Sequence, residues 1–137
     1  IELRQAGINS PIMVLTAGTD SFEQIINYGL EPGIPNIYSL KVLCDVLSKR
    51  GMSDFPIHLK LDTGMHRLGF MTEELDELLG FLKDCPQIKV KSVYSHLAAA
   101  DDPACDEFTL GQIELFMKNA DKISEVVGYK PLYHILN

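Results

Sequence analysis

The sequence predicts an α/β fold built on a parallel β-sheet. Five strand-like segments, which begin at residues 11, 36, 56, 90 and 132, alternate with segments of helical periodicity. Helix-length connections between successive strands are typical of β–α units, whose strands run parallel. An open doubly wound sheet and a closed (β/α)8 TIM barrel both fit this alternation. A complete barrel needs about 250 residues, and the chain has 137, so a barrel would be partial.

The first elements follow from strand and helix-end signals. Residues 1–7 resemble the end of an amphipathic helix, with Leu3 and Ala6 on one face and Gly7 after the last turn. Residues 11–15 form a continuous apolar run, as expected for a strand buried on both faces. Asp20 with Glu23 three residues later predicts a helix start, and that helix ends near Gly29.

The middle of the chain repeats the pattern. Residues 36–39 are predicted as the second strand, followed by a helix over residues 40–50 that Gly51 closes. Residues 56–62 alternate strictly between polar and apolar side chains, which predicts the third strand. This alternation places His58, Lys60 and Asp62 on one face, where buried titratable groups need partners or a ligand.

Two further helix–strand units complete the prediction. Residues 72–74 cap a helix whose leucines follow the i, i+3, i+4, i+7 rule, and residues 90–97 form the fourth strand. Thr109 and Gln112 have the spacing of a capping box that opens the longest helix. Residues 132–137 form the fifth strand. The apolar faces of these two helices consist of Leu75, Leu78, Leu79 and Leu82, and of Ile113, Phe116, Met117 and Ala120.

Composition limits the class of protein. Hydrophobic residues make up 46% of the chain, enough for a core, but no apolar run approaches the roughly 18 residues of a membrane span. The net charge of −7 argues against nucleic-acid or anionic-membrane partners. Three widely spaced cysteines, Cys44, Cys85 and Cys105, indicate reduced thiols in a cytoplasmic protein. A helix end without its beginning and a final strand without a following element predict an internal segment of a longer polypeptide.

In either architecture, chemistry lies beyond the carboxyl ends of the strands. This places the candidate residues within 62–67, within 96–102 and at Asn137. Gly64 and Gly69 allow a tight turn after the third strand, and Arg67 on this turn is suited to bind an anionic oxygen. The simplest structural alternative is a salt bridge between Lys60 and Asp62 at the rim.

Other chemistries fit the residues less well. Asp62-Thr63-Gly64 is also the core of the aspartic-protease signature, but that class is all-β. The four histidines lack metal-ligand spacing, so no metal site is predicted. Asp101 and Asp102 suit a solvated loop whose charges favour the next helix N-terminus better than a cation site.

Residues 60–69 resemble the signature of the alanine racemase family: Lys, an apolar residue, Asp-Thr-Gly-Met, a small residue, Arg, an aliphatic residue and Gly. Residues 94–101 are similar to a second block of that family, and residues 134–137 to the start of a third. Residues 3–7 and 11–15 also match. The resemblance extends over residues 1–137 and implies a truncated N-terminal barrel domain, roughly strands 3 to 7, that carries pyridoxal 5'-phosphate. His66 departs from the pattern, which has Gly or another small residue there.

The resemblance implies a role for each matching residue. Arg67 would hydrogen-bond the phenolic oxygen of the cofactor, and Lys60 behind it, carbamylated in several members, would orient that arginine. His96 would stand beside the pyridine ring. Asn137 would lie near the cofactor and Leu15 would be an apolar contact, while Asp62 and Met65 belong to the same motif as supporting residues.

The resemblance also implies what this segment lacks. One base of the family is a lysine that precedes this segment in the chain and bonds covalently to the cofactor. The other is a tyrosine of the partner subunit, so no catalytic base is expected here. The parent would be a cytoplasmic, bacterial, homodimeric racemase that interconverts L- and D-alanine for peptidoglycan, and this segment alone would be inactive. The alternatives are a serine racemase, a pyridoxal-phosphate homeostasis barrel without a further domain, or a plain scaffold segment.

Overall fold

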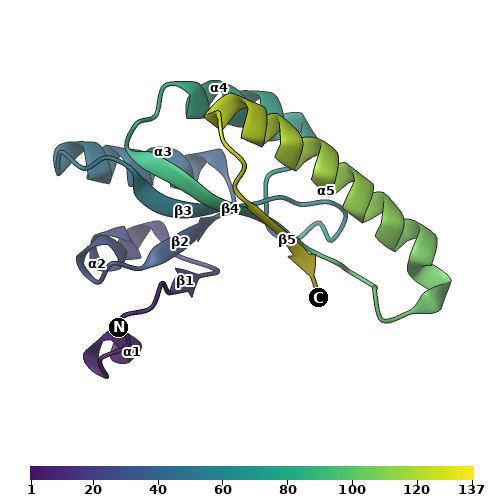
Figure 1. Cartoon of the computed structure of the whole chain (residues 1–137), viewed down its shortest axis with the longest axis horizontal. Helices are drawn as coiled ribbons and strands as arrows, with labels where there is room; N and C mark the ends of the chain where they lie inside the picture. Colours follow the sequence, from purple (N-terminus) through teal and green to yellow (C-terminus); the bar gives the residue numbers. More distant parts are fainter.

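Five parallel strands lie side by side in the order in which they occur in the chain. The computed structural model describes residues 1–137 (Figure 1). The strands are β1 (Met13–Val14), β2 (Glu31–Ile34), β3 (Phe55–Lys60), β4 (Ile88–His96) and β5 (Leu132–Leu136). The helices are α1 (Glu2–Gln5), α2 (Phe22–Asn27), α3 (Ile37–Lys49), α4 (Leu75–Lys83) and α5 (Asp106–Val127).

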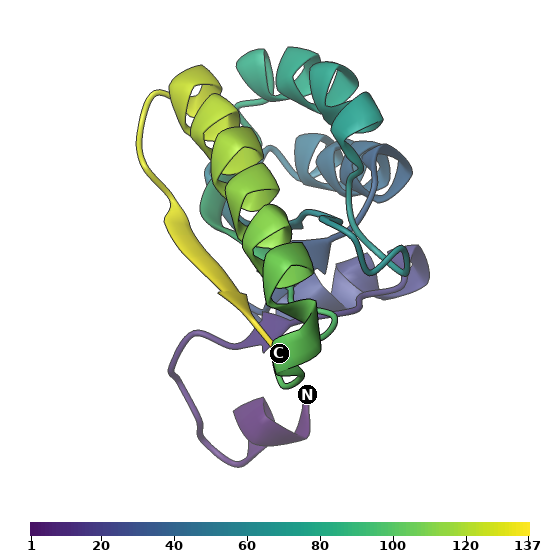
Figure 2. The same cartoon turned by 90° about the vertical axis from the view of Figure 1, so that its right-hand side faces the viewer.

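The strand order distinguishes a barrel from a doubly wound sheet. A doubly wound sheet reverses its strand order at a switch point and carries helices on both faces. Here the order is sequential, and α3, α4 and α5 gather on one face of the curved sheet (Figures 1 and 2). The fold is therefore a partial (β/α)8 barrel, the architecture that the family resemblance implied.

The main core lies between the sheet and these helices. Ile57 and Leu59 of β3 are fully buried within it. The helices contribute apolar stripes at helical spacing, and full burial of one such side chain stabilises the fold by about 2 kcal/mol. The predicted leucine face of α4 is confirmed, although Leu79 is only half-buried. The buried aliphatic and aromatic residues of α3, α4 and α5 are Leu40, Leu43, Leu47, Leu75, Leu78, Leu82, Phe116, Ala120 and Ile123.

The second strand was predicted at the wrong place. Asn36 is the N-cap of α3, and its side chain accepts a hydrogen bond of 2.8 Å from the Ser39 N–H, so residues 37–39 are helical. The strand is Glu31–Ile34, whose Pro32 and Gly33 are residue types depleted in strands. Gly33 is needed there because a Cβ would lie 2.5 Å from the Tyr94 hydroxyl.

The first strand and the start of α2 also differ from the prediction. Strand β1 contains only Met13 and Val14, and both are half-buried rather than buried on both faces. A 3-10 turn, Thr19–Ser21, precedes α2, and no side chain caps this helix.

The long helix α5 begins before the predicted capping box. It starts at Asp106, preceded by the 3-10 turn Pro103–Cys105, and Asp102 caps that turn by accepting from the Ala104 N–H at 3.0 Å. Gln112 is buried within the helix, where its side chain serves contacts described below. Met117 is 40% exposed, so the predicted apolar face is only partly correct. No helix of the structure combines the length and the apolar character that a bilayer span requires.

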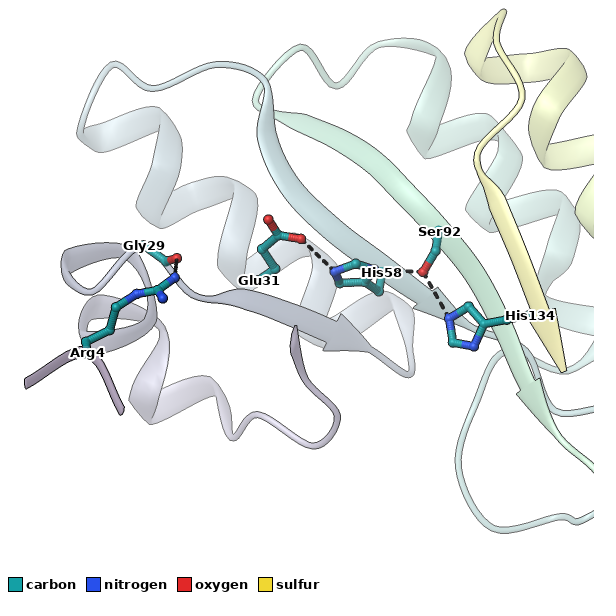
Figure 3. A network of polar contacts seen from close by, with 6 residues as sticks. All are labelled: Arg4, Gly29, Glu31, His58, Ser92 and His134. Carbon is teal, nitrogen blue, oxygen red and sulfur yellow. Dashed lines mark hydrogen bonds and ion pairs between the residues drawn. The ribbon is translucent and has the colours of Figure 1, made fainter. Parts of the chain in front are cut away.

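Arg4 fixes the N-terminal segment to the rest of the fold. Its guanidinium donates to the carbonyl oxygens of Tyr28 at 3.0 Å and Gly29 at 2.9 Å, and the second contact is drawn in Figure 3. It also donates to Ile8 and Ser10, each at 2.7 Å. One side chain thus joins α1, which has no buried residue of its own, to the segment before β1 and to the end of α2.

Candidate functional site

The turn after β3 is organised by one carboxylate. Asp62 Oδ1 accepts hydrogen bonds from the backbone N–H groups of Gly64 and His66, and Oδ2 accepts one from Arg67, each at 3.0 Å. The predicted salt bridge to Lys60 is wrong, because no ion pair joins these two residues. The carboxylate instead holds the backbone that carries Arg67.

The backbone of this turn explains the glycines of the motif. Gly69 has φ of 128°, and a Cβ there would lie 2.6 Å from the Asp62 backbone nitrogen. Phe70 then pairs with the end of β3, its N–H donating to the Lys60 carbonyl at 2.8 Å. His66 has φ of 52°, a left-handed conformation in which glycine is favoured over residues with a side chain. The His66 side chain is exposed, so the departure from glycine affects the backbone conformation and not the packing of the turn.

The environment of Asp62 differs from that of a proton-sharing carboxyl group. Burial alone would raise its pKa, but the N–H donors of Gly64, His66 and Arg67 outweigh burial and hold the pKa below its usual value. A catalytic aspartate dyad needs one carboxyl with a raised pKa beside a second carboxyl. Together with the parallel α/β sheet, this overturns the aspartic-protease alternative.

Several predicted site residues line one cavity at the carboxyl ends of the strands. Its volume is about 350 Å³, within the range of small-molecule sites. Four of the candidate residues, Lys60, Arg67, His96 and Leu15, line it. The residues that sequence analysis did not assign to it are Thr16, Leu68, Tyr94, Ser95, His134 and Leu136.

The positive charges of the cavity form no ion pair within the chain. The exposed Arg67 guanidinium donates to no residue of the chain, and Lys60 forms no ion pair. Burial and the nearby Arg67 charge lower the pKa of Lys60, although Asp62 opposes them. The Lys60 Nζ lies 5.1 Å from the centroid of the Tyr94 ring, a cation–π distance. Such a pair of cations is suited to an anionic ligand.

Tyr94 is a buried aromatic residue that lines this cavity. Its ring stacks on His134 with centroids 5.2 Å apart and planes 6° from parallel. Its hydroxyl donates to the Leu15 carbonyl at 3.3 Å, and burial raises its pKa to about 12. Tyr94 therefore remains a neutral hydrogen-bond donor that links β4 to the end of β1.

The other predicted residues lie at different distances from the cavity. Met65 and Asp62 line a narrow crevice beside it, together with Lys60 and Arg67. Asn137 follows β5 directly and is exposed, but it does not line the cavity. No group of three or more His, Cys, Asp and Glu side chains is placed to hold a metal ion.

A buried polar network ties the motif turn to β4 and α5. Ser95 donates to the Leu61 carbonyl at 2.8 Å and lies 2.9 Å from the Thr63 hydroxyl. Gln112 of α5 accepts from the Ala98 N–H at 3.0 Å and donates to the His96 carbonyl at 3.3 Å. Sequence reasoning missed these roles because the partners come from three separate elements.

A second polar network crosses the sheet below the cavity (Figure 3). His58 Nε2 lies 2.9 Å from Glu31 Oε2, and His58 Nδ1 lies 2.7 Å from Ser92 Oγ. Ser92 Oγ in turn lies 3.3 Å from His134 Nε2. These four residues, Glu31, His58, Ser92 and His134, come from four adjacent strands and are called the cross-strand relay below. Only His58 carried a signal in the sequence, through the alternation that placed it on the face of Lys60.

The relay has a defined hydrogen-bond direction. Burial lowers the pKa of His58 even though Glu31 favours its charged form, so His58 is neutral at pH 7. A carboxylate can only accept, and therefore His58 donates from Nε2 to Glu31 and accepts at Nδ1 from the Ser92 hydroxyl. Ser92 Oγ then accepts from His134 Nε2. Burial, followed by the nearby His58, likewise lowers the pKa of His134.

Comparison with known proteins gives a consistent result. Residues 1–137 match the family model described as "Alanine racemase, N-terminal domain". An alanine racemase of Synechocystis sp. is 37% identical over 139 residues, covering 100% of this chain and 37% of the relative. An alanine racemase of Thermodesulfovibrio yellowstonii is 35% identical over 137 residues, covering 100% of this chain and 36% of the relative. The chain thus spans little more than a third of the length of these relatives.

Solved structures agree with the sequence matches. The crystal structure of alanine racemase from D-cycloserine-producing Streptomyces lavendulae superposes with a TM-score of 0.87 and 26% identity, over 98% of this chain and 36% of that one. Alanine racemase from Bacillus anthracis with bound L-Ala-P gives a TM-score of 0.79 at 25% identity, over 98% of this chain and 34% of that one. The curved five-stranded sheet is therefore similar to part of a known barrel domain.

Proposed function

Because the chain belongs to the alanine racemase N-terminal domain family, we propose that it is part of a pyridoxal-phosphate-dependent enzyme that interconverts L- and D-alanine. The observation that carries this proposal is the cavity at the carboxyl ends of the strands. It brings Lys60, Arg67 and His96 together beside the motif turn. Their side chains lack acidic partners within the chain, so the site is prepared for an anionic ligand.

The donor set of the cavity fits pyridoxal 5'-phosphate. This cofactor has an aromatic ring with an ionisable phenolic oxygen and a phosphate. The unpaired Arg67 guanidinium suits an anionic oxygen, and the Leu15 and Tyr94 side chains offer apolar and aromatic surface for a ring. When bound, the cofactor serves as the electron sink that makes an amino-acid Cα proton removable.

Arg67 is the residue proposed to hold the phenolic oxygen. Its backbone N–H is fixed by Asp62, so the guanidinium starts from an immobilised backbone position. A permanently charged donor at this oxygen orients the ring and favours the ionised phenol. His96, Asn137 and Leu15 are proposed to complete the surroundings of the ring, with Met65 supporting the turn.

Lys60 is proposed to carry a carbamate. Its lowered pKa increases the fraction of neutral amine, and the amine nitrogen can then bond to the carbon of CO2 with loss of one proton. The product is an anion beside Arg67 in place of a cation. The carbamate would accept hydrogen bonds from the Arg67 guanidinium and hold it in position. Asp62 would not be needed for this, because its carboxylate already accepts from the N–H groups of the turn.

The assembly around this segment is also part of the proposal. Both catalytic bases would lie outside residues 1–137, one of them on a partner subunit, so the segment alone would be inactive and the enzyme a homodimer. We place the enzyme in the bacterial cytoplasm, where D-alanine is supplied to peptidoglycan. The bacterial alanine racemase relatives support this assignment.

A racemisation assay of the intact protein tests the proposal. L-Alanine and L-serine are supplied separately with pyridoxal phosphate, and the D-enantiomer is measured by chiral chromatography, with residues 1–137 alone as the control. Faster formation of D-alanine by the intact protein supports the proposal. Faster formation of D-serine would establish a serine racemase, and cofactor binding without turnover would favour the homeostasis-type barrel. Turnover by residues 1–137 alone would contradict the assignment of both bases to other parts of the protein.

A further inference from the structure

Two cysteines that are distant in sequence meet at the end of the fold opposite the cavity. Cys44 lies in α3 and Cys85 lies between α4 and β4, and their Sγ atoms are 3.0 Å apart across 41 residues of sequence. The region around Cys85 marks the amino ends of the strands, because the Phe55 N–H at the start of β3 donates to the Gln87 carbonyl. The spacing of the cysteines in the sequence gave no sign of this contact.

The two thiols differ in exposure and in acidity. Cys44 is 7% exposed, whereas Cys85 is half-buried. The hydrogen bond from Cys44 lowers the pKa of Cys85 more than burial raises it, and a backbone N–H at Gln87 also favours the thiolate. The same contact and burial raise the pKa of Cys44. Because Cys85 is the more exposed sulfur, a small disulfide reaches it first, and Cys44 is the thiol that reacts second.

The surface around Cys85 is open to a small molecule. Cys85 lines two surface hollows of about 430 Å³ and about 440 Å³. Cys44 lines only the second, which is bordered by α3 and α4 residues. A small disulfide can approach Cys85 from either side without entering the core.

We propose that Cys44 and Cys85 form a reversible disulfide by exchange with a low-molecular-weight disulfide, of which oxidised glutathione is the probe. The Cys85 thiolate bonds to one sulfur of the small disulfide, whose S–S bond breaks and releases one small thiolate. The Cys44 thiol gives its proton to that leaving thiolate. The Cys44 sulfur then bonds to Cys85 Sγ, the bond between Cys85 and the small molecule breaks, and the second small thiolate leaves and takes a proton from water. The two protein thiols are oxidised by two electrons, and the small disulfide is reduced to two thiols.

The bond would join α3 to the segment that enters β4. Both attachment points are at the helix layer and the amino ends of the strands, where residues support stability rather than chemistry in barrels of this kind. The cross-link would constrain the unfolded chain while leaving the cavity residues in place. This inference does not depend on the proposed function.

Peptide mapping of the intact protein tests the inference. The folded protein is incubated with oxidised glutathione, free thiols are blocked, and a non-reducing digest is analysed by mass spectrometry. We expect a Cys44–Cys85 linked peptide in the wild type and in Cys105→Ser, the matched control. Cys44→Ala should accumulate glutathione on Cys85, whereas Cys85→Ala should leave Cys44 unmodified.

Thermal unfolding of the wild type provides a measurement that needs no variant. Oxidation should raise the midpoint by roughly 5 °C, and a dithiol reductant should reverse the rise. A wild-type protein that keeps glutathione on Cys85 without the linked peptide would overturn the proposal. So would a linked peptide that forms only after the protein has been unfolded.

Discussion

Two polar clusters occupy the same face of the sheet and differ in how their polar atoms are paired. In the cross-strand relay of Glu31, His58, Ser92 and His134, a continuous series of hydrogen bonds joins four strands. In the cavity two residues further along β3, Lys60 forms no ion pair and the Arg67 side chain donates to no residue of the chain. The alternation of β3 places His58 and Lys60 on one face, so the clusters are neighbours.

This difference in pairing indicates that the relay stabilises the fold and that the cavity binds a ligand. A buried polar group is tolerated when its partners are supplied by the same chain, and the buried His58 and Ser92 meet this condition, whereas His134 at the end of the relay is exposed. Arg67 remains exposed and hydrated, so it does not need an internal partner and is available to a ligand. We therefore expect substitutions of Glu31, His58 or Ser92 to lower the free energy of unfolding and substitutions of Arg67 to lower ligand affinity. His134 belongs to both clusters.

The largest effect on stability is expected for His58→Leu. This change leaves the Glu31 carboxylate, 13% exposed, without its partner and the Ser92 hydroxyl without its acceptor, and should lower the unfolding free energy by about 3 kcal/mol. Urea denaturation of the intact protein measures it. The double variant Glu31→Leu/His58→Leu is the control and should recover part of the loss. A single variant as stable as the wild type would show that the relay does not support the fold.

Arg67→Gln should give the opposite pattern. Loss of a charge-assisted hydrogen bond predicts about 30-fold weaker binding of pyridoxal phosphate, equivalent to about 2 kcal/mol. The unfolding free energy without cofactor should change by less than about 0.5 kcal/mol, since the side chain has no partner to lose. Fluorescence titration and urea denaturation measure the two quantities. Unchanged affinity would remove Arg67 from the proposed site.

Asp62→Asn should affect both stability and binding, because Asp62 connects the turn to Arg67. The amide nitrogen cannot accept from the Arg67 N–H, which predicts a loss of about 1.5 kcal/mol in unfolding free energy and weaker cofactor binding. Because the pKa of Asp62 is lowered in the fold, its contribution is present above the unfolded pKa of about 3.9 and is lost as pH falls through the folded value. The variant and wild type should therefore converge in stability in acid. A constant difference at all pH values would contradict this assignment.

The relay also predicts a gradual pH dependence near neutrality. The folded pKa values of His58 and His134 lie below the unfolded value of about 6.5, so the unfolded chain binds more protons in that interval. Stability is then complete above about pH 6.5 and decreases as pH falls below it. Urea midpoints between about pH 7.5 and pH 5.5 measure this slope. The urea midpoint of His58→Leu should change less with pH than that of the wild type. An equal change would show that groups other than His58 cause the pH dependence.

The smallest effect is expected for His66→Gly. Relief of the left-handed backbone, offset by the greater freedom of glycine in the unfolded chain, should stabilise the protein by about 0.5 kcal/mol. Asp54→Gly is the matched control, since Asp54 has φ of 54° and aspartate accepts this conformation more readily. A denaturant midpoint lowered by His66→Gly would show that the His66 side chain contributes contacts of its own.

Local sequence patterns predicted most of the helices and strands. They failed where contacts between distant segments determine the conformation or role of a residue. The leucines of α4 and the alternation of β3 were read correctly because both depend on residues close in sequence. Strand β2 was missed because Gly33 is required by Tyr94 and Leu15, which are distant in the chain. Gln112 was read as a capping residue because its partners at Ala98 and His96 are visible only in the fold.

The sequence alone determined the alternation of strands and helices, the motif turn with its two glycines, and Arg67 as a candidate ligand for an anion. Each of these depends on residues within about ten positions of one another, a range over which side-chain periodicity and backbone preferences act directly. The alternation alone left the open sheet and the partial barrel open, the family resemblance implied the barrel, and the strand order confirms it. Only the tertiary structure completed the relay around His58 and brought Cys44 beside Cys85. Those features require segments that are distant in the chain to pack together, and parallel strands joined by helices achieve this through contacts that no local pattern contains.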